Sequence, residues 1–152
     1  MQVRFLADYP QEVGTIANWY YNEWGHKDPK VCLATIRDKV LLGASKDRIP
    51  LAFFIKMSEE VVGAGEIKYR DLPDFPGYQY WLDGIYVPAE HRGKGISTRL
   101  IEFAKEKASE LGLPSLHLSC EAHNVKLYEN RGFKLVRESS DRFIMEYSIT
   151  TS

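Results

Sequence analysis

The sequence predicts a mixed α+β fold, in which helices flank a mostly antiparallel sheet that contains one parallel pair of strands. Residues 49–57 and 61–69 alternate in hydrophobicity on either side of a short polar turn, which is typical of an antiparallel hairpin. Residues 96–111 carry apolar side chains at helical spacing, with charged side chains on the other faces. Strand, helix and strand follow one another over residues 80–120, and such a crossover favours a parallel pair in one sheet.

The first third of the chain is expected to form a strand and then two helices. Residues 3–7 predict a short strand. A helix is predicted over residues 8–25, because a proline stands near its start, apolar side chains recur at helical spacing and a glycine ends the pattern. Similar signals predict a second helix over residues 28–43, which Asp28-Pro29 opens.

The middle of the chain is expected to complete an antiparallel meander. Gly63 and Gly65 interrupt the strand over residues 61–69, so we expect either a β-bulge or a close approach of the backbone to another element there. After a loop over residues 70–77, a third strand is predicted over residues 78–87.

The C-terminal part is expected to consist of short elements. The helix over residues 96–111 ends where a glycine and a proline follow it. A strand over residues 115–120 and a short helix over about 122–131 come next. Residues 133–136 and 143–147 are expected to form a closing hairpin.

Length and composition limit the kinds of protein this chain can be. With 44% hydrophobic residues, residues 1–152 are expected to form one domain around a single core. The 20 Lys and Arg are balanced by 21 Asp and Glu, so no overall charge draws the chain to nucleic acid or to an anionic membrane. We find no secretory signal, no bilayer-spanning apolar run and, with only Cys32 and Cys120, no disulfide framework. The sequence therefore predicts a cytoplasmic protein.

The segment before the helix over residues 96–111 has the composition of an anion-binding loop. In His91-Arg92-Gly93-Lys94-Gly95-Ile96-Ser97-Thr98, two glycines let several backbone N–H groups face one direction. The helix N-terminus and the side chains of Arg92 and Lys94 add positive charge, so a pyrophosphate is the natural ligand. A Walker A loop is excluded because Gly95 follows Lys94, and a dinucleotide fingerprint lacks the glycine it needs at Thr98. A plain helix-capping turn is the alternative.

Three blocks of sequence between about Val61 and Phe133 stand in an order and at a spacing that a known family shares. They are Ile85-Tyr86-Val87-Pro88-Ala89-Glu90, Arg92-Gly93-Lys94-Gly95-Ile96-Ser97 and Leu127-Tyr128-Glu129-Asn130-Arg131-Gly132-Phe133. The second block resembles the Gln/Arg-x-x-Gly-x-Gly/Ala pyrophosphate loop of the GNAT superfamily of acyl-CoA N-acyltransferases. The first resembles that family's strand-to-loop entry, and the third its Leu-Tyr-Glu-x-x-Gly-Phe segment.

The resemblance implies a GNAT-like sheet with a central, splayed parallel strand pair and acetyl-CoA as the co-substrate. Backbone groups of Ile85 and Val87 are implied to pair with the pantetheine arm in the slot that the splayed strands make. A backbone N–H near this strand end is implied to stabilise the oxyanion of the thioester carbonyl. The residues implied to bind the co-substrate are Ile85, Tyr86, Val87, Arg92, Gly93, Lys94, Gly95, Ile96, Ser97 and Thr98.

Two carboxylates are candidates for a catalytic base. Attack on a thioester needs a neutral amine, and an alkyl amine of pKa about 10 loses its proton at a cost of roughly 4 kcal/mol at pH 7. Asp83 lies four residues before Val87, and strict alternation would put both on the face that points to the slot. Glu66 on the preceding strand is the second candidate. Either carboxylate can instead end a hydrogen-bond network or face water.

Tyr128 matches the family position of the residue that protonates the departing coenzyme thiolate. A phenol of pKa about 10 can donate to a thiolate of pKa about 8.5 if it is held near the sulfur. The alternative is a tyrosine of the apolar core. The four histidines show no spacing that predicts a metal site, and no serine or cysteine nucleophile motif is present. We therefore expect direct transfer in a ternary complex, without a metal.

The predicted function is transfer of an acetyl group to a primary amine of a small molecule or of a peptide or protein. A catalytically silent acyl-CoA sensor is the alternative from another class of protein, and a longer acyl group also stays open. Glu66, Asp71, Asp74 and Asp83 lie on or beside the strands and the loop expected to contact the acceptor, which favours a cationic amine. Asp71 and Asp74 also suit an ordinary polar loop. The sequence leaves the identity of the acceptor and a homodimer open.

Overall fold

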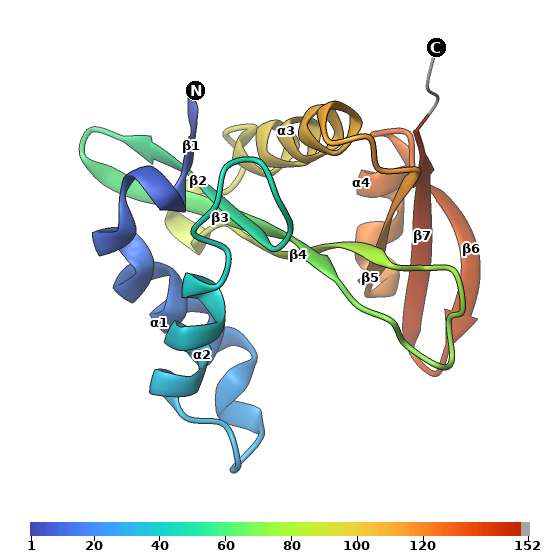
Figure 1. The fold of residues 1–152 in the computed structure, drawn as a ribbon, viewed down its shortest axis with the longest axis horizontal. Helices are drawn as coiled ribbons and strands as arrows, with labels where there is room; N and C mark the ends of the chain where they lie inside the picture. Colours follow the sequence, from blue (N-terminus) through green and yellow to red (C-terminus); the bar gives the residue numbers. More distant parts are fainter. Residues whose placement is uncertain (150–152) are drawn as a thin grey trace.

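The computed structural model describes residues 1–149, which contain seven strands in one sheet and four α-helices (Figure 1). The strands are β1 (Val3–Phe5), β2 (Leu51–Met57), β3 (Glu60–Tyr69), β4 (Tyr80–Tyr86), β5 (Ser115–Cys120), β6 (Lys134–Ser139) and β7 (Arg142–Ser148). The helices are α1 (Val13–Glu23), α2 (Leu33–Leu41), α3 (Ile96–Glu110) and α4 (Val125–Glu129). None of the helices in this part of the chain is long and apolar enough to cross a lipid bilayer.

The sheet has the order β1-β2-β3-β4-β5-β7-β6, and its neighbours are antiparallel except for β4 and β5. Within the described residues, one residue pair, Trp81 with His117, joins these two parallel strands. Toward their carboxyl ends the strands diverge, so the edge of β4 that faces β5 has no strand partner there. The predicted sheet, mostly antiparallel with one splayed parallel pair, is confirmed.

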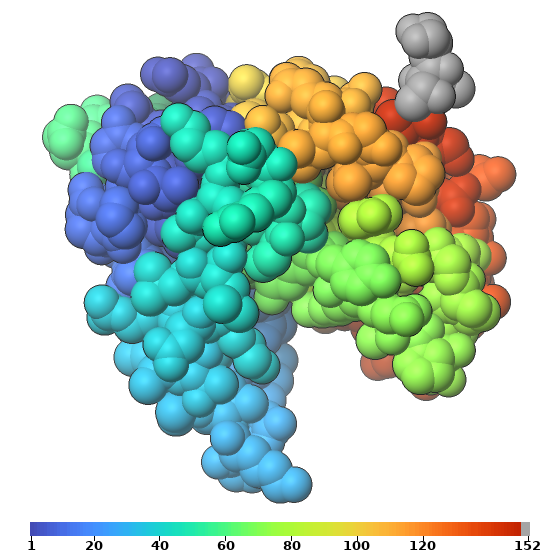
Figure 2. Space-filling view, viewed as in Figure 1, coloured from blue at the N-terminus to red at the C-terminus, as the bar shows by residue number. Residues whose placement is uncertain are grey.

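Two apolar clusters lie on opposite faces of the sheet. Helices α1 and α2 cover one face, where the buried side chains are Leu6, Val13, Ile16, Tyr20, Val40, Ala52, Phe54, Val61 and Ala64. Helix α3 covers the other face, and its buried residues Ile96, Leu100, Ile101, Ala104 and Ala108 pack with Leu51, Phe53, Ile55 and Leu116. In the space-filling view, α1 and α2 project on one side of a notch and the segment between β3 and β4 projects on the other (Figure 2).

Gly63 and Gly65 are positions of close approach to the β3 backbone, one of the two outcomes expected for them. A Cβ atom on Gly63 would lie 2.6 Å from Cγ2 of Ile96, so the first residue of α3 rests directly on the strand. A Cβ atom on Gly65 would lie 2.6 Å from Cδ1 of Ile85. The register also shifts beside Gly63, because Ile55 pairs with Gly63 while the next residue of β2 pairs with Val61. A bulge therefore accompanies the close approach.

A second bulge lies in β4 and corrects one expectation from the sequence. Asp83 pairs with Glu66, whereas Tyr86 pairs with Ala64, so three steps along β4 match two along β3. Gly84 takes a positive φ of 62° at this point. Leu82 and Val87 consequently share the core under α3, although they stand an odd number of positions apart and strict alternation would put them on opposite faces. The prediction that Asp83 and Val87 share a strand face is wrong, because the bulge reverses the alternation between them.

The start of the second helix also differs from its prediction. The side chain of Asp28 accepts a hydrogen bond from the backbone N–H of Lys30 at 2.9 Å, which closes a turn around Pro29. Helix α2 then begins at Leu33, after Cys32 in an extended conformation. The Asp-Pro pair is thus a turn signal here, a local bond that competes with helix formation.

Candidate active site

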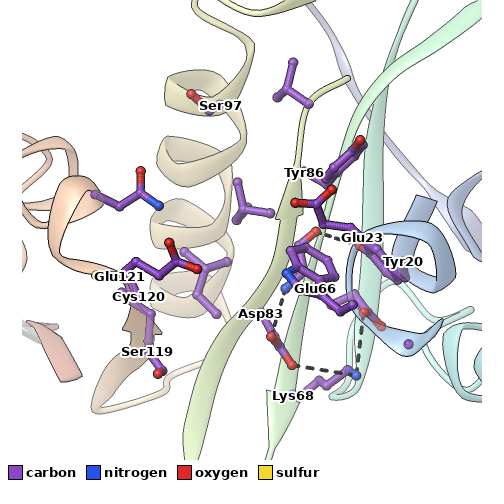
Figure 3. A pocket seen from close by; sticks show the side chains of 18 of the residues that line it. Tyr20, Glu23, Glu66, Lys68, Asp83, Tyr86, Ser97, Ser119, Cys120 and Glu121 are labelled. Atoms are coloured by element: carbon purple, nitrogen blue, oxygen red, sulfur yellow. Dashed lines mark hydrogen bonds and ion pairs between the residues drawn. The ribbon is translucent and has the colours of Figure 1, made fainter. Parts of the chain in front are cut away.

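The divergence of β4 and β5 opens a cavity of about 870 Å³ that reaches from the N-terminus of α3 to helices α1 and α2 (Figure 3). Its β4 wall runs from Leu82 to Val87, and its β5 wall from Leu118 to Cys120. Of the predicted site residues, those that line it are Glu66, Asp83, Ile85, Tyr86, Val87, Arg92, Ser97 and Tyr128. Gly93, Lys94, Gly95, Ile96 and Thr98 belong to the same loop and helix start but are not among the lining residues.

The loop between β4 and α3 presents free backbone donors. Gly93 and Gly95 take positive φ angles of 80° and 81°, a conformation that favours glycine. No backbone carbonyl among residues 1–149 accepts the N–H groups of Gly93, Lys94 or Gly95. The first N–H groups of α3 have no partner inside the helix either. Nε of Arg92 donates to the carbonyl of Val87 at 3.0 Å, which holds the loop against the end of β4. These free donors leave the loop open to an anion, and the pyrophosphate assignment stays a prediction.

Glu66 is a buried carboxyl at the opposite end of the cavity. It lies on β3 and is 3% exposed. The pKa of Glu66 is raised from 4.5 to about 7, mainly by burial; Lys68 opposes this shift, and the nearby Asp83 carboxylate adds to it. Nζ of Lys68 lies 3.6 Å from Oε1 of Glu66. A carboxyl with this pKa exists in both protonation states near neutral pH, which suits proton transfer.

Asp83 is held by cations and by the backbone rather than free. Its Oδ2 atom contacts Nη2 of Arg70 and lies 3.8 Å from Nζ of Lys68. Its Oδ1 atom accepts the N–H of Gly84 at 2.9 Å. These contacts tie Asp83 into a network with Arg70, Lys68 and the backbone, whereas Glu66 is buried.

Tyr20 is a site residue that sequence reasoning assigned only to the apolar face of a helix. Its hydroxyl donates to the carbonyl of Gly84 at 2.8 Å and so fixes the bulge of β4 against α1. A Cβ atom on Gly84 would lie 2.7 Å from that hydroxyl oxygen and 3.1 Å from Oε1 of Glu66. The positive φ and this crowding both require glycine at position 84. The Gly84 carbonyl lies on a different element from Tyr20, so helical spacing gave no signal of this bond.

Tyr128 lies on α4, across the cavity from β4. Its ring packs edge-on against Phe133, with 5.8 Å between ring centroids. Burial raises the pKa of the Tyr128 phenol to about 12. The hydroxyl therefore carries its proton at neutral pH, as a proton donor must.

The acidic residues expected to contact the acceptor do not all lie at the cavity. Asp71 and Asp74 line neither of the two cavities found in the described part of the chain. Lys68 and Arg70 offset the charges of Glu66 and Asp83, so the four carboxylates do not form one negative cluster. Arg142 of β7 lines both cavities, and no motif in the sequence singled it out.

One small group of side chains resembles a cation site but lies away from the cavities. Glu60, Glu90 and His91 place one potential ligand atom each within 4.8 Å of one another. An ion pair of 3.2 Å between His91 and Glu60 accounts for much of this arrangement. Both carboxylates are exposed to solvent.

Solved structures share this fold. An aminoglycoside 6'-N-acetyltransferase complexed with coenzyme A superimposes with a TM-score of 0.77 at 14% identity, covering 100% of this chain and 99% of its own. A ribosomal-protein-alanine N-acetyltransferase from Brucella melitensis gives 0.72 at 19% identity, covering 98% and 100%. The PaiA N-acetyltransferase from Thermoplasma acidophilum, complexed with coenzyme A, gives 0.64 at 18% identity, covering 97% and 99%.

Sequence comparison identifies the family. None of the curated proteins matches the sequence. The family model described as "Acetyltransferase (GNAT) family" matches residues 4–133, from β1 to the end of the segment that contains Tyr128. This match spans most of the chain and includes the loop, the bulged strand and α4. The chain therefore belongs to the GNAT family of acetyltransferases.

Proposed function

We propose that the protein is an acetyl-CoA-dependent N-acetyltransferase that transfers the acetyl group directly to a primary amine of a small molecule or peptide in a ternary complex. One observation carries the proposal: a single cavity joins the donor-rich loop at one end to a buried carboxyl of pKa about 7 at the other. Two similar structures were solved with coenzyme A, which supports a ligand of this type.

The residues at the loop end fit the pyrophosphate of coenzyme A. Arg92 and Lys94 supply positive charge, and the N–H groups from Gly93 onward supply hydrogen-bond donors. No atom lies within 3.7 Å of a Cβ placed on Gly93 or Gly95, so the loop is open to a ligand. The unpaired edge of β4 near Ile85 and Val87 is where the pantetheine arm would add as a neighbouring strand does. Bound acetyl-CoA supplies the activated thioester.

Glu66 is the proposed catalytic base. The acceptor arrives mostly as an ammonium ion, whose deprotonation at pH 7 costs roughly 4 kcal/mol for an amine of pKa about 10. A carboxyl of pKa about 7 is half ionised at neutral pH and can accept this proton, whereas Asp83 is already engaged by Arg70. Asp83, with Arg70 and Lys68 around it, is proposed to bind the ammonium group and to orient it toward Glu66.

Tyr128 is the proposed general acid, and Cys120 is not a nucleophile. The neutral phenol of Tyr128 is positioned at the cavity wall to return a proton to the departing thiolate. Cys120 also lines the cavity, but burial raises the pKa of its thiol, which disfavours the thiolate that a covalent route needs. Direct transfer therefore fits these residues best.

An amine-panel assay tests the proposal. Purified protein is mixed with acetyl-CoA and single amines, and release of free thiol is followed. We expect turnover with at least one primary amine and none with the matched tertiary amine. A catalytically silent acyl-CoA sensor would bind acetyl-CoA in calorimetry yet release no thiol with any amine, and that result would overturn the proposal.

A further inference from the structure

A second cavity of about 450 Å³ continues from the first on the side of the segment that follows β3. Leu82, Asp83, Ser119 and Arg142 line both cavities, so the two share a wall. The other residues that line the second cavity are Arg70, Leu72, Phe75, Trp81, Ser139, Ser140 and Ile144. An acceptor whose amine reaches Glu66 has this cavity as space for the rest of the molecule.

Arg142 presents a guanidinium group that is already held in one orientation. Its Nε donates to Oγ of Ser119 at 3.0 Å, and its Nη2 donates to the carbonyl of Ser119 at 2.9 Å. A guanidinium has five N–H donors, so three are left after these two bonds. Nη1 lies 3.7 Å from a carboxylate oxygen of Glu121, which is an ion-pair distance rather than a hydrogen bond. The outer edge of this group is therefore prepared for a planar anion.

The charge balance of the second cavity favours a single negative charge on its occupant. Arg70 and Arg142 are positive and Asp83 is negative, which leaves one net positive charge among the lining residues. Asp83 is already paired with Arg70, and Nζ of Lys68 lies 3.8 Å from the same carboxylate oxygen. Glu121, the carboxylate nearest Arg142, is 62% exposed and also pairs with His123, so water screens its attraction for the guanidinium. A monoanion matches this balance better than a dianion such as phosphate.

Apolar walls that are fixed in place complete the cavity. Phe75 and Trp81 meet edge-on, with 6.0 Å between ring centroids. Nε1 of Trp81 donates to the carbonyl of Tyr78 at 2.9 Å, and Arg137 lies over the ring of Phe75 at 5.1 Å. These contacts hold the aromatic wall on the face of the sheet, opposite the hydroxyls of the β6–β7 turn. The wall suits an apolar or aromatic group.

We propose that the acceptor is a small primary amine that carries a carboxylate and an apolar or aromatic body, as an aromatic amino acid does, and that Arg142 binds the carboxylate. The inference rests on the proposed function and specifies its substrate class. Arg142 is then the residue that sets specificity, through a two-pronged contact between its free N–H groups and the two carboxylate oxygens. Phe75 and Trp81 contact the body of the acceptor, and the amine lies toward Asp83 and Glu66.

A matched series of amines tests the proposal. Phenylalanine, phenylalaninamide and 2-phenylethylamine share one ring and one amine but differ in having a carboxylate, a carboxamide or neither. We expect kcat/KM for phenylalanine to exceed that for the other two by about tenfold or more, mainly through KM. The amide has the least basic amine and is the easiest to deprotonate, so a preference for phenylalanine over it that appears in KM does not come from easier deprotonation.

Variants of Arg142 assign the preference to that residue. Arg142→Gln is expected to bring the ratio between phenylalanine and phenylalaninamide close to one, and Arg142→Lys to give an intermediate ratio because it keeps the charge but loses the planar fork. Arg48→Gln is the control, because it removes the same charge from an exposed loop outside both cavities. In this variant the ratio between phenylalanine and phenylalaninamide is expected to keep its wild-type value. Thermal melting confirms that each variant is folded.

The outcomes separate this inference from the proposed function. Turnover of phenylalaninamide that equals or exceeds that of phenylalanine would overturn the assignment of Arg142 as the carboxylate-binding residue. A preference for phenylalanine that persists in Arg142→Gln would do the same. In both cases the proposed acetyltransferase function would still stand. If no amine is acetylated, calorimetry of phenylalanine binding to the coenzyme A-loaded protein decides. Binding that Arg142→Gln weakens about tenfold or more supports the carboxylate site. Absent or unchanged binding overturns it.

Discussion

The two ends of the reaction cavity are built in different ways. The proposed coenzyme end consists of consecutive residues, from Arg92 to Thr98, and offers mainly backbone N–H groups at a helix start. The proposed amine end consists of side chains from distant parts of the chain: Tyr20 of α1, Glu66 of β3, Asp83 of β4 and Arg142 of β7. A backbone site needs only a local conformation, whereas a side-chain site needs the whole sheet to be assembled.

The electrostatics of the two ends differ as well. The loop is exposed and carries the positively charged Arg92 and Lys94, which favours an anion there. Glu66 is buried, and burial brings its pKa to about 7. Charge at the coenzyme end is therefore set by residue type, and charge at the amine end by the environment that the fold creates. Each prediction below changes one end and asks whether the other responds.

The largest effect is expected from Glu66→Gln, which removes the proposed base. General-base catalysis contributes a factor of about 10² to 10⁴, so kcat should fall by that amount while the affinity for coenzyme A stays the same. The wild-type kcat/KM should rise with pH and level off above about 7, because Glu66 accepts a proton only when ionised. The variant should lose this inflection.

Asp83→Asn serves as the comparison for the assignment of the base. It removes a carboxylate that Arg70 already pairs, and a smaller loss of kcat is expected. If Asp83→Asn removes the inflection in the pH profile of kcat/KM and Glu66→Gln keeps it, Asp83 is the base and Glu66 is not.

At the coenzyme end, the double variant Gly93→Val, Gly95→Val should weaken coenzyme A binding by about a hundredfold, since charge-assisted hydrogen bonds contribute roughly 1.5–3 kcal/mol each. A side chain with positive φ also costs about 1–2 kcal/mol per residue in stability. Gly112→Val is the matched control, because Gly112 has a φ of 74° and open space around it but lies outside the cavity. Calorimetry that shows unchanged affinity in the folded double variant would remove the phosphate role of the loop.

Tyr128→Phe tests whether α4 belongs to the chemistry or only to packing. The ring stays, so kcat should fall at least tenfold through loss of the proton donor, with little change in coenzyme A affinity. Tyr147→Phe is the control, because Tyr147 also packs on Phe133, at 5.5 Å between centroids, without lining either cavity. If Tyr128→Phe melts earlier but turns over at the wild-type rate, the phenol is structural.

The smallest effect concerns stability. The pKa of Glu66 is higher in the folded state, about 7, than its ordinary 4.5, so the folded state binds more protons between these values. Stability attributable to Glu66 therefore falls as pH rises from about 4.5 to about 7. Glu66→Gln has no such pH-dependent loss. The Tm of the variant minus the Tm of the wild type should therefore be several degrees larger at pH 8 than at pH 5, which corresponds to a change of roughly 1–3 kcal/mol in relative stability. A Tm difference that is independent of pH would contradict the raised pKa.

The same contrast explains what the sequence could and could not predict. The loop and the crossover around α3 are local, so glycine spacing and hydrophobic periodicity were sufficient to find them. Glu66 was found only as one of two candidates, because its burial depends on α1 and on the neighbouring strand. Tyr20 looked like an ordinary core residue, and Arg142 carried no signal, since the partners of both lie far away in sequence.

The bulge at Gly84 has a consequence for how β4 tolerates changes in length. Residues before it and after it follow opposite alternation, so Leu82 and Val87 both pack under α3 while Asp83 lies on the other face of the strand, where it pairs with Glu66. Inserting or deleting one residue between Asp83 and Val87 would exchange the two faces of one half of the strand. The spacing from Asp83 to Val87 is thus as strictly constrained as the identity of any residue in the site.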